Sequence, residues 1–193
     1  MKLVHPAIAA ALGLAFCGTA FAQAGTVQRD VNQQQRIEQG LQSGQLTTRE
    51  ASKLEREESR VERDQSRAMQ DGKLSPAEKA RLAREQNRVS RDIYREKHDA
   101  QTGNPNSASS QRMQADVQRN INQQQRIEQG VKSGSLTNRE TARLERGEAR
   151  IDRKEARAGA NGKVNAAEQR RIQRAENRES RRIYKEKHDA QTK

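Results

Sequence analysis

The chain has 193 residues and a formal net charge of +12, and a third of its residues are charged. Aromatic residues make up 2% of it and there is no Trp. This composition argues against a large globular core. The scarcity of aromatic rings also argues against single-stranded nucleic acid as a ligand, because such binding relies on stacked bases.

Residues 1–22 have the pattern of a secretory signal peptide. Lys2 gives the positive start, the apolar run that ends at Phe16 is too short to span a bilayer, and Ala20-Phe21-Ala22 is a small-x-small cleavage site. We expect a mature, secreted chain that starts at Gln23, lies in the bacterial periplasm and has no transmembrane span. A retained membrane anchor and a lipoprotein attached through Cys17 are the alternatives.

Two copies of one sequence follow the signal peptide. Val27–Thr102 aligns without gaps with Val117–Thr192 at an offset of 90, and 45 of the 76 pairs are identical. We therefore predict a first helical repeat over 23–102, a flexible linker rich in Gly, Asn, Pro and Ser over 103–116, and a second, more basic repeat over 117–193. The linker would make the copies two independent units.

A short motif, Gly-x-(Leu/Val)-(Ser/Thr/Asn)-x-x-Glu, occurs four times. The Gly can take the left-handed conformation that ends a helix. The hydroxyl or amide side chain and the Glu then form a capping box that starts the next helix. The predicted structural helix caps are Gly44, Thr47, Glu50, Gly72, Ser75, Glu78, Gly134, Thr137, Glu140, Gly162, Asn165 and Glu168.

The turns divide each copy into three helices, which in the first copy are Val27–Gln42, Thr48–Gln70 and Pro76–His98. Apolar residues fall on one narrow, coiled-coil-like face of these helices. Glu58 and Glu62 alternate with Arg60 and Arg63, so we expect ionised carboxylates in ion pairs along the helix surface. The predicted fold is all-α, a tandem duplication of antiparallel three-helix units with thin cores and possible homo-oligomerisation.

The excess positive charge lies in the second copy. Val117–Lys193 has 20 basic and 11 acidic residues, whereas Val27–Thr102 has 16 and 14. Such a charged face can attract polyanions, although a solvated helix surface explains the same pattern. The predicted polyanion-binding residues lie on the last helix and are Arg170, Arg171, Arg174, Arg178, Arg181, Arg182, Lys185 and Lys187.

The end of each copy repeats an Ile-Tyr-x-Glu-Lys-His-Asp sequence. Imidazole and carboxylate side chains are metal ligands, so one hypothesis is a metal site made by His98, Asp99, His188 and Asp189 across the copies. The alternative is that Lys and His interact with the dipole at a helix end. Asp71-Gly72 to Glu78 also resembles half of an EF-hand loop, but Arg67 and Met69 stand where the first oxygen ligands belong.

The sequence contains no Walker loop, no GxSxG and no HExxH motif, and the mature chain has no Cys. We therefore expect a protein that is not an enzyme and has no cofactor. Leu46-Thr47-x-x-Glu50 and Leu136-Thr137-x-x-Glu140 resemble the Leu-Thr-x-x-Gln motif of the Spy/CpxP-like periplasmic helical proteins, with Glu in place of Gln. That family includes an ATP-independent chaperone and metal-stress sensors.

Three functions follow as expectations. The first is an envelope-stress, chaperone-like protein that engages acidic or unfolded proteins. The second is a metal-binding stress protein that uses the His-Asp helix ends. The third is a binder of envelope polyanions such as lipopolysaccharide, or of nucleic acid.

Overall fold

The computed structural model describes residues 17–189, with side chains from residue 23 onward. Within this part every regular element is helical, which confirms the predicted all-α fold. The elements are α1 (Cys17–Ser43), α2 (Thr48–Ala68), α3 (Pro76–Lys97), α4 (Ala108–Ser133), α5 (Asn138–Ala158), the 3₁₀ helix η1 (Gly159–Asn161) and α6 (Ala166–Lys187).

The predicted signal peptide is only partly described. Residues 1–16 lie outside the described residues, and residues 17–22 form the first turns of α1. Its cleavage after Ala22 stays a prediction. In the part of the chain that the structure describes, no helix is long and apolar enough to cross a membrane.

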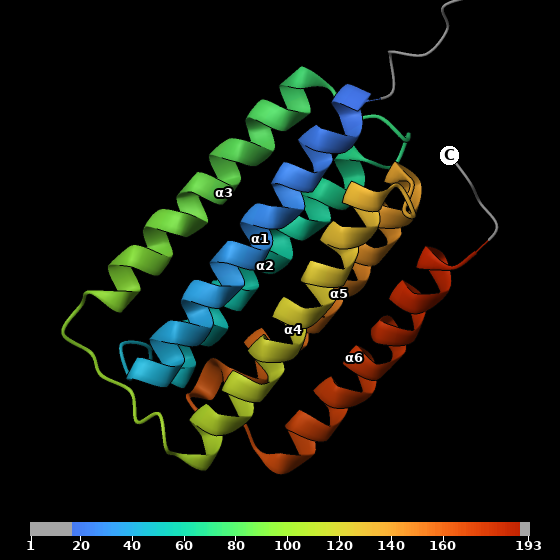
Figure 1. Ribbon diagram of the computed structural model, residues 1–193. Coiled ribbons are helices and arrows are strands. Elements are labelled where there is room, and N and C mark those ends of the chain that lie inside the picture. Colours follow the sequence, from blue (N-terminus) through green and yellow to red (C-terminus); the bar gives the residue numbers. More distant parts are fainter. Residues whose placement is uncertain (1–16, 190–193) are drawn as a thin grey trace, which may run out of the picture.

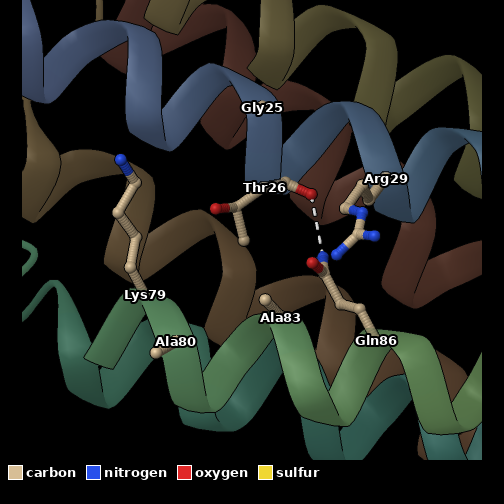
Figure 2. Close-up of a pocket in the computed structure, with 7 residues that line it drawn as sticks. All are labelled: Gly25, Thr26, Arg29, Lys79, Ala80, Ala83 and Gln86. Atoms are coloured by element: carbon tan, nitrogen blue, oxygen red, sulfur yellow. Dashed lines mark hydrogen bonds between the residues drawn. The ribbon is translucent and has the colours of Figure 1, made fainter. Parts of the chain in front are cut away.

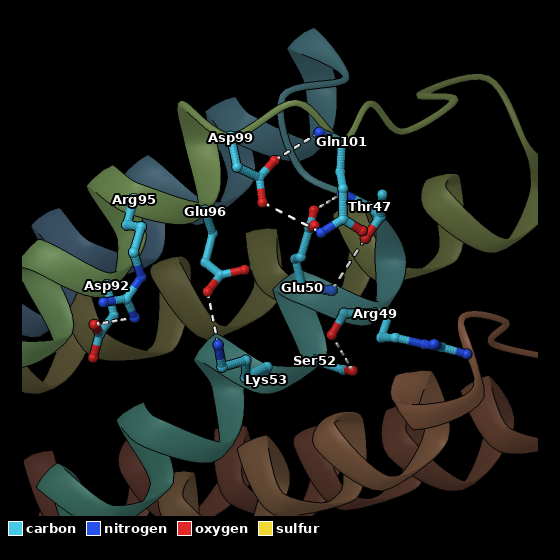
Figure 3. A network of polar contacts seen from close by, with 10 residues as sticks. All are labelled: Thr47, Arg49, Glu50, Ser52, Lys53, Asp92, Arg95, Glu96, Asp99 and Gln101. Atoms are coloured by element: carbon cyan, nitrogen blue, oxygen red, sulfur yellow. Dashed lines mark hydrogen bonds and ion pairs between the residues drawn. The ribbon is translucent and has the colours of Figure 1, made fainter.

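The four repeated turns have the cap geometry that their motif predicts. Their glycines have φ angles of 76°, 88°, 82° and 84° in chain order, in the left-handed region. All four capping boxes are formed. In the first, the Thr47 N–H donates to Glu50 Oε2 at 2.8 Å and Thr47 Oγ1 accepts from the Glu50 N–H at 3.2 Å (Figure 3).

The two copies form one body rather than two separate units, so the prediction of independent copies is wrong. Helices α1, α2, α4 and α5 make a central four-helix bundle, with α3 on one outer side and α6 on the other (Figure 1). The most extensive packing is between copies, α2 against α5 and α1 against α4, with each pair antiparallel (Figure 1). A thin apolar face cannot be buried within one copy, and the other copy covers it.

The segment between the copies is also more ordered than predicted. Ser107 caps α4, which begins at Ala108, so residues 108–116 of the predicted linker are helical. The connection is also fixed to the first copy, because the Gly103 N–H donates to the Gly44 carbonyl at 2.8 Å.

The largest apolar cluster crosses the boundary between the copies. It joins side chains of all six helices, so no single copy holds it. The cluster contains Ile37, Leu41, Leu46, Ala51, Leu54, Val61, Val89, Ile93, Met113, Val117, Ile121, Ile151, Ala158, Val164, Ile172 and Ala175.

We predict that Gly72→Ala lowers the free energy of unfolding by about 1 kcal/mol or more, because an L side chain is strained at φ 88°. An added Cβ would approach no atom closer than 3.6 Å, so backbone strain is the main term. Urea unfolding measures the loss. Gly72→Asn is the control and should cost less, since Asn tolerates the left-handed region. Equal losses for Ala and Asn would contradict this explanation.

Candidate metal centre in the bundle core

Eleven carboxylate side chains are buried in and beside the bundle core. We call them the core carboxylates. They come from five helices, and they are Asp30, Glu55, Glu58, Glu62, Asp116, Glu145, Glu148, Asp152, Glu155, Glu176 and Glu179. On α2 they follow the spacing i, i+3, i+7 and so lie on the face that also carries Leu54 and Val61.

Few of these charges are compensated. Arg119 Nε lies 3.0 Å from Glu176 Oε2, and Arg182 Nη1 lies 2.9 Å from Glu179 Oε2. The other nine core carboxylates have no ion pair with any described residue. A buried charge without a partner is costly, so these nine groups need either protons or a bound cation.

The prediction that Glu58 and Glu62 form ion pairs on the helix surface is therefore wrong, because both side chains are buried. Arg60 is exposed, and Arg63 directs its Nε to the Ser59 carbonyl at 2.9 Å. The physical reason is helical geometry. Residues two apart, such as Glu58 and Arg60, lie on nearly opposite sides of a helix, so the acid enters the core and the base faces water.

Glu55 of α2 meets Asp152 and Glu155 of α5, and one oxygen of each lies within 4.8 Å of the others. We call this group the first carboxylate set. Asn120 Nδ2 donates to Asp152 Oδ1 at 3.3 Å and to Glu155 Oε2 at 2.9 Å, and Gln34 Nε2 donates to Glu55 Oε2 at 3.0 Å. Each carboxylate keeps one oxygen without a donor. The amides orient the set and leave one oxygen per carboxylate for a ligand.

Glu58 lies next to the first set. It is 1% exposed, and neither of its carboxylate oxygens has a hydrogen-bond donor. Burial raises its pKa well above the usual range, and the charges of Asp30, Glu55 and Asp152 raise it further. An unpartnered carboxylate beside three others is the arrangement expected around a cation.

Burial raises the pKa of several other core carboxylates into the neutral range. The pKa is about 7 for Asp30, Glu55 and Glu176 and about 8 for Asp116. The other core carboxylates of α2 and α5 have pKa values well above the usual range. Burial is the largest cause, and most of the further increase comes from the charges of neighbouring carboxylates. Without a cation, the folded core therefore retains protons near neutral pH.

The donor set of this core is made of oxygen alone. Carboxylate and amide oxygens suit hard cations such as Ca²⁺, Mg²⁺ and Mn²⁺, whereas thiolate and imidazole select softer metals. Helix bundles build metal sites from side chains on facing helices, as α2 and α5 are placed here. The residues of the first set thus fit a hard cation.

The predicted His-Asp site across the copies is not formed. His98 ends α3 and His188 ends α6, at opposite ends of the bundle (Figure 1). Both imidazoles are exposed. The Nδ1 atom of His98 lies 2.7 Å from the backbone carbonyl oxygen of Tyr94, and His188 has the same contact with Tyr184. Each imidazole also stacks on the aromatic ring of that Tyr. The histidines end their helices, and they cannot share one ion.

Asp99 belongs to an acidic group with Glu50 and Glu96, and Asp189 to the equivalent group with Glu140 and Glu186. In the first group the carboxylates are engaged. Glu50 accepts from the Thr47 N–H, Glu96 Oε1 from Lys53 Nζ at 2.7 Å, and Asp99 from the Gln101 N–H at 2.8 Å (Figure 3). Of these contacts, the ion pair of Lys53 with Glu96 joins the start of α2 to the end of α3.

The half EF-hand resemblance marks a turn between helices. Arg67 forms an ion pair with Asp64 at 3.2 Å and Met69 is buried, so neither supplies an oxygen ligand. Glu78 Oε2 accepts from the N–H and Oγ of Ser75, as a cap residue does.

A shallow groove of about 290 Å³ runs between α1 and α3. Gly25, Ala80 and Ala83 leave the space, and Arg29 and Lys79 border it (Figure 2). Gln86 closes its inner side by donating to the Thr26 carbonyl at 2.9 Å (Figure 2) and to Asp30 Oδ1 at 2.7 Å. The groove therefore stops at the layer of core carboxylates.

The predicted polyanion-binding residues of α6 lie on its outer side. Arg170, Arg171, Arg174, Arg178 and Arg181 are exposed. Arg182 and Lys185 are exposed too, with Arg182 paired to Glu179, and Lys187 is half-buried. The structure thus places these cations along one helix, facing away from the bundle.

Comparison with known proteins identifies no relative, since no protein-family model, curated protein or solved structure matches the chain.

We predict that, with a chelator present, the free energy of unfolding falls as the pH rises from about 5 to about 8. The raised folded-state pKa values, about 7 for Glu55 and about 8 for Asp116, mean that the folded protein holds protons that the unfolded chain releases above its ordinary carboxyl pKa. Urea unfolding at several pH values measures this slope.

The control is Glu58→Gln, whose amide cannot ionise. It should make the pH dependence shallower and raise stability at pH 8 relative to the unaltered chain. A stability that rises steadily from pH 5 to pH 8 would contradict the assignment of protons to the folded core.

Proposed function

We propose that this chain is a non-enzymatic protein that holds hard, oxygen-preferring metal cations in the core of its helix bundle. The observation that carries the proposal is the first carboxylate set, in which Glu55, Asp152 and Glu155 converge without a basic partner. Two amides hold one oxygen of each carboxylate in place and leave the other for a ligand.

Burial of the set supports storage or buffering of the cation rather than catalysis. Glu55, Asp152 and Glu155 are each 0% exposed, so a cation held there cannot also touch a substrate outside the bundle. A metal ion that acts as a Lewis acid needs an open coordination position for substrate or water. Together with the expected secretion, this favours a role in controlling cations in the cell envelope.

Cations and protons compete for the same oxygens in this proposal. Carboxylates must lose their protons to bind a metal, so binding releases protons and strengthens as the pH rises. Metal binding is therefore coupled to folding: a cation restores at pH 8 the stability that protons supply at pH 5.

We predict that Ca²⁺, Mn²⁺ or La³⁺ raises the melting temperature of the chelator-treated full chain at pH 8. At one hundred times the dissociation constant, binding to the folded form adds about 2.7 kcal/mol, or about 5–10 °C for a chain of this size. Differential scanning calorimetry measures the shift. Glu55→Gln with Glu155→Gln should reduce it by half or more.

Two controls separate this site from the predicted His-Asp site and from the loss of a surface acid. His98→Ala with His188→Ala should leave the shift unchanged, because the imidazoles lie at the helix ends. Asp71→Asn should also have no effect, since it gives the first copy the Asn that the second copy has at Asn161. If none of the three cations moved the melting temperature, the proposed function would be wrong.

A second function, binding of acidic partners or envelope polyanions, is favoured by the outer side of α6. Along α3, Glu85 and Asp92 interrupt the basic residues, and Arg81 and Arg95 are paired with them. At the matching positions α6 has Ala175, which is buried, and Arg182. Its acids Glu176 and Glu179 are turned into the bundle. Positive charge is therefore left with few acidic neighbours on this surface.

We predict that Arg174→Glu with Arg178→Glu and Arg181→Glu weakens binding to a heparin column far more than the matched change on α3, Arg84→Glu with Arg88→Glu and Arg91→Glu. Charge reversal removes contacts that release counterions, so the salt concentration needed for elution falls. Circular dichroism checks that both variants stay helical. Equal losses from the two triple variants would contradict a specific role of α6.

A further inference from the structure

The sequence repeat places a second group of side chains beside the first carboxylate set. At an offset of 90, Glu55 corresponds to Glu145, Asp152 to Glu62, and Glu155 to Gln65. Because α2 and α5 pack against each other and are antiparallel (Figure 1), we expect the contact of Glu55 with Asp152 and Glu155 to be repeated by the contact of Glu145 with Glu62 and Gln65.

The contacts of Gln124 show that this second group is assembled. Its Nε2 donates to Glu62 Oε1 at 2.7 Å and to Glu145 Oε2 at 3.4 Å, so one amide joins a carboxylate of α2 to a carboxylate of α5. Gln65 Nε2 donates to Asp30 Oδ2 at 2.7 Å, so a third carboxylate lies against the amide of Gln65. We call Asp30, Glu62, Gln65 and Glu145 the second set.

The two sets have the same number of acids, placed on different helices. The first has Glu155 on α5 and Asn120 on α4, whereas the second has Gln65 on α2 and Asp30 on α1. The carboxylate that the second set lacks on one helix is supplied by the neighbouring helix. The first set brings three carboxylates together directly, whereas in the second set Gln124 joins Glu62 to Glu145 and Gln65 holds Asp30.

Oxygens of the second set also lack donors. Glu62 Oε2, Gln65 Oε1 and Glu145 Oε1 are buried without a hydrogen-bond partner. Glu148, which corresponds to Glu58, is 0% exposed and both of its carboxylate oxygens are unpartnered. The carboxylate of Glu145 is among the charges that act on it. An unpartnered, fully buried carboxylate therefore accompanies each set.

The sets meet at Glu62 and Asp152, which correspond to each other in the repeat. Burial raises the pKa of both carboxyl groups, and they lie close enough for each to shift the pKa of the other. A cation on either side of this pair would offset the repulsion between the two carboxylates.

We propose that the core binds two hard cations, the second at Glu62, Glu145 and Gln65 with Asp30 behind them, and that Glu62 and Asp152 lie between the two ions. This inference rests on the proposed function and extends it from one cation to two. It also assigns Gln65 and Asp30 a part in making the two positions unequal, beside the difference between Glu62 and Asp152.

Isothermal titration of the chelator-treated full chain with Mn²⁺ at pH 8 tests the inference. We expect two Mn²⁺ per chain. Glu145→Gln should leave one, held by the first set, and Glu155→Gln should leave one, held by the second. Electron paramagnetic resonance should show magnetic coupling between the two ions in the unaltered chain and its loss in each variant. Circular dichroism shows whether the variants are folded.

A variant that exchanges residues between the sets tests the second set by a gain of Mn²⁺ affinity rather than a loss. Gln65→Glu with Asp30→Asn gives the second set the residues that the first set has at the corresponding positions, Glu155 and Asn120, and keeps the number of acids. It should lower the Mn²⁺ dissociation constant of the weaker site by about tenfold or more, because affinity depends on the negative charge of the residues that coordinate the ion. Asp71→Asn is the control for the loss of a surface acid and should change nothing.

The outcomes separate the two proposals. One Mn²⁺ per chain, lost in Glu155→Gln and unaffected by Glu145→Gln or by the exchange variant, would overturn the second site and leave the proposed function standing. No binding of Mn²⁺, Ca²⁺ or La³⁺ would overturn both. Two uncoupled ions that persist in Glu145→Gln would place the second ion elsewhere and also overturn the inference.

Discussion

The structure depends on neutralising the carboxylates that α2 and α5 bring together. These two helices form the largest interface of the fold, and it lies between the two copies of the sequence. Without protons or cations, nine acids without ion pairs would repel one another in a medium that screens charge poorly. Whatever neutralises them, protons or the proposed cation, also holds the copies together, so neutralisation of the core and assembly of the bundle are one equilibrium.

Small side chains let these helices come close enough to build the set. Ser59 Oγ donates to the Ala149 carbonyl at 2.8 Å, a contact between two residues that correspond in the repeat. On the other side of α5, Gly147 leaves the space that the carboxyl group of Glu179 on α6 fills, since a Cβ there would overlap it. Close approach shortens the distance between acids on facing helices. The same residues that permit tight packing therefore create the electrostatic cost that protons or a bound cation must offset.

The sequence predicts local structure here far better than it predicts packing. The cap motif locates the helix starts at Thr48, Pro76 and Asn138, because capping depends on residues only a few positions apart. The partner of each helix depends on contacts between positions about 90 apart, such as Ser59 with Ala149, and no local pattern encodes these. An apolar stripe too thin for one copy was the available sign that the copies pack together.

The carboxylate sets were missed for a related reason. Glu58 and Arg60 alternate in sequence, which resembles a surface of ion pairs, and only the helical period separates them into a buried acid and an exposed base. Glu55, Glu58 and Glu62 share the face of Leu54 and Val61, a pattern that does indicate burial. The predicted histidines were chosen for their chemistry, but their position at helix ends puts them far from the core.

The separation of acids inside from bases outside connects the core to the surface. Protonating the nine unpaired core carboxylates raises the net charge of the chain from +12 to +21, because 12 plus 9 is 21. Cations bound at the same oxygens add positive charge in a similar way. The outer side of α6 therefore attracts a polyanion more strongly when the core is neutralised. By thermodynamic linkage a polyanion on α6 must in turn favour the neutralised core, which makes the two proposed functions mutually reinforcing rather than alternative.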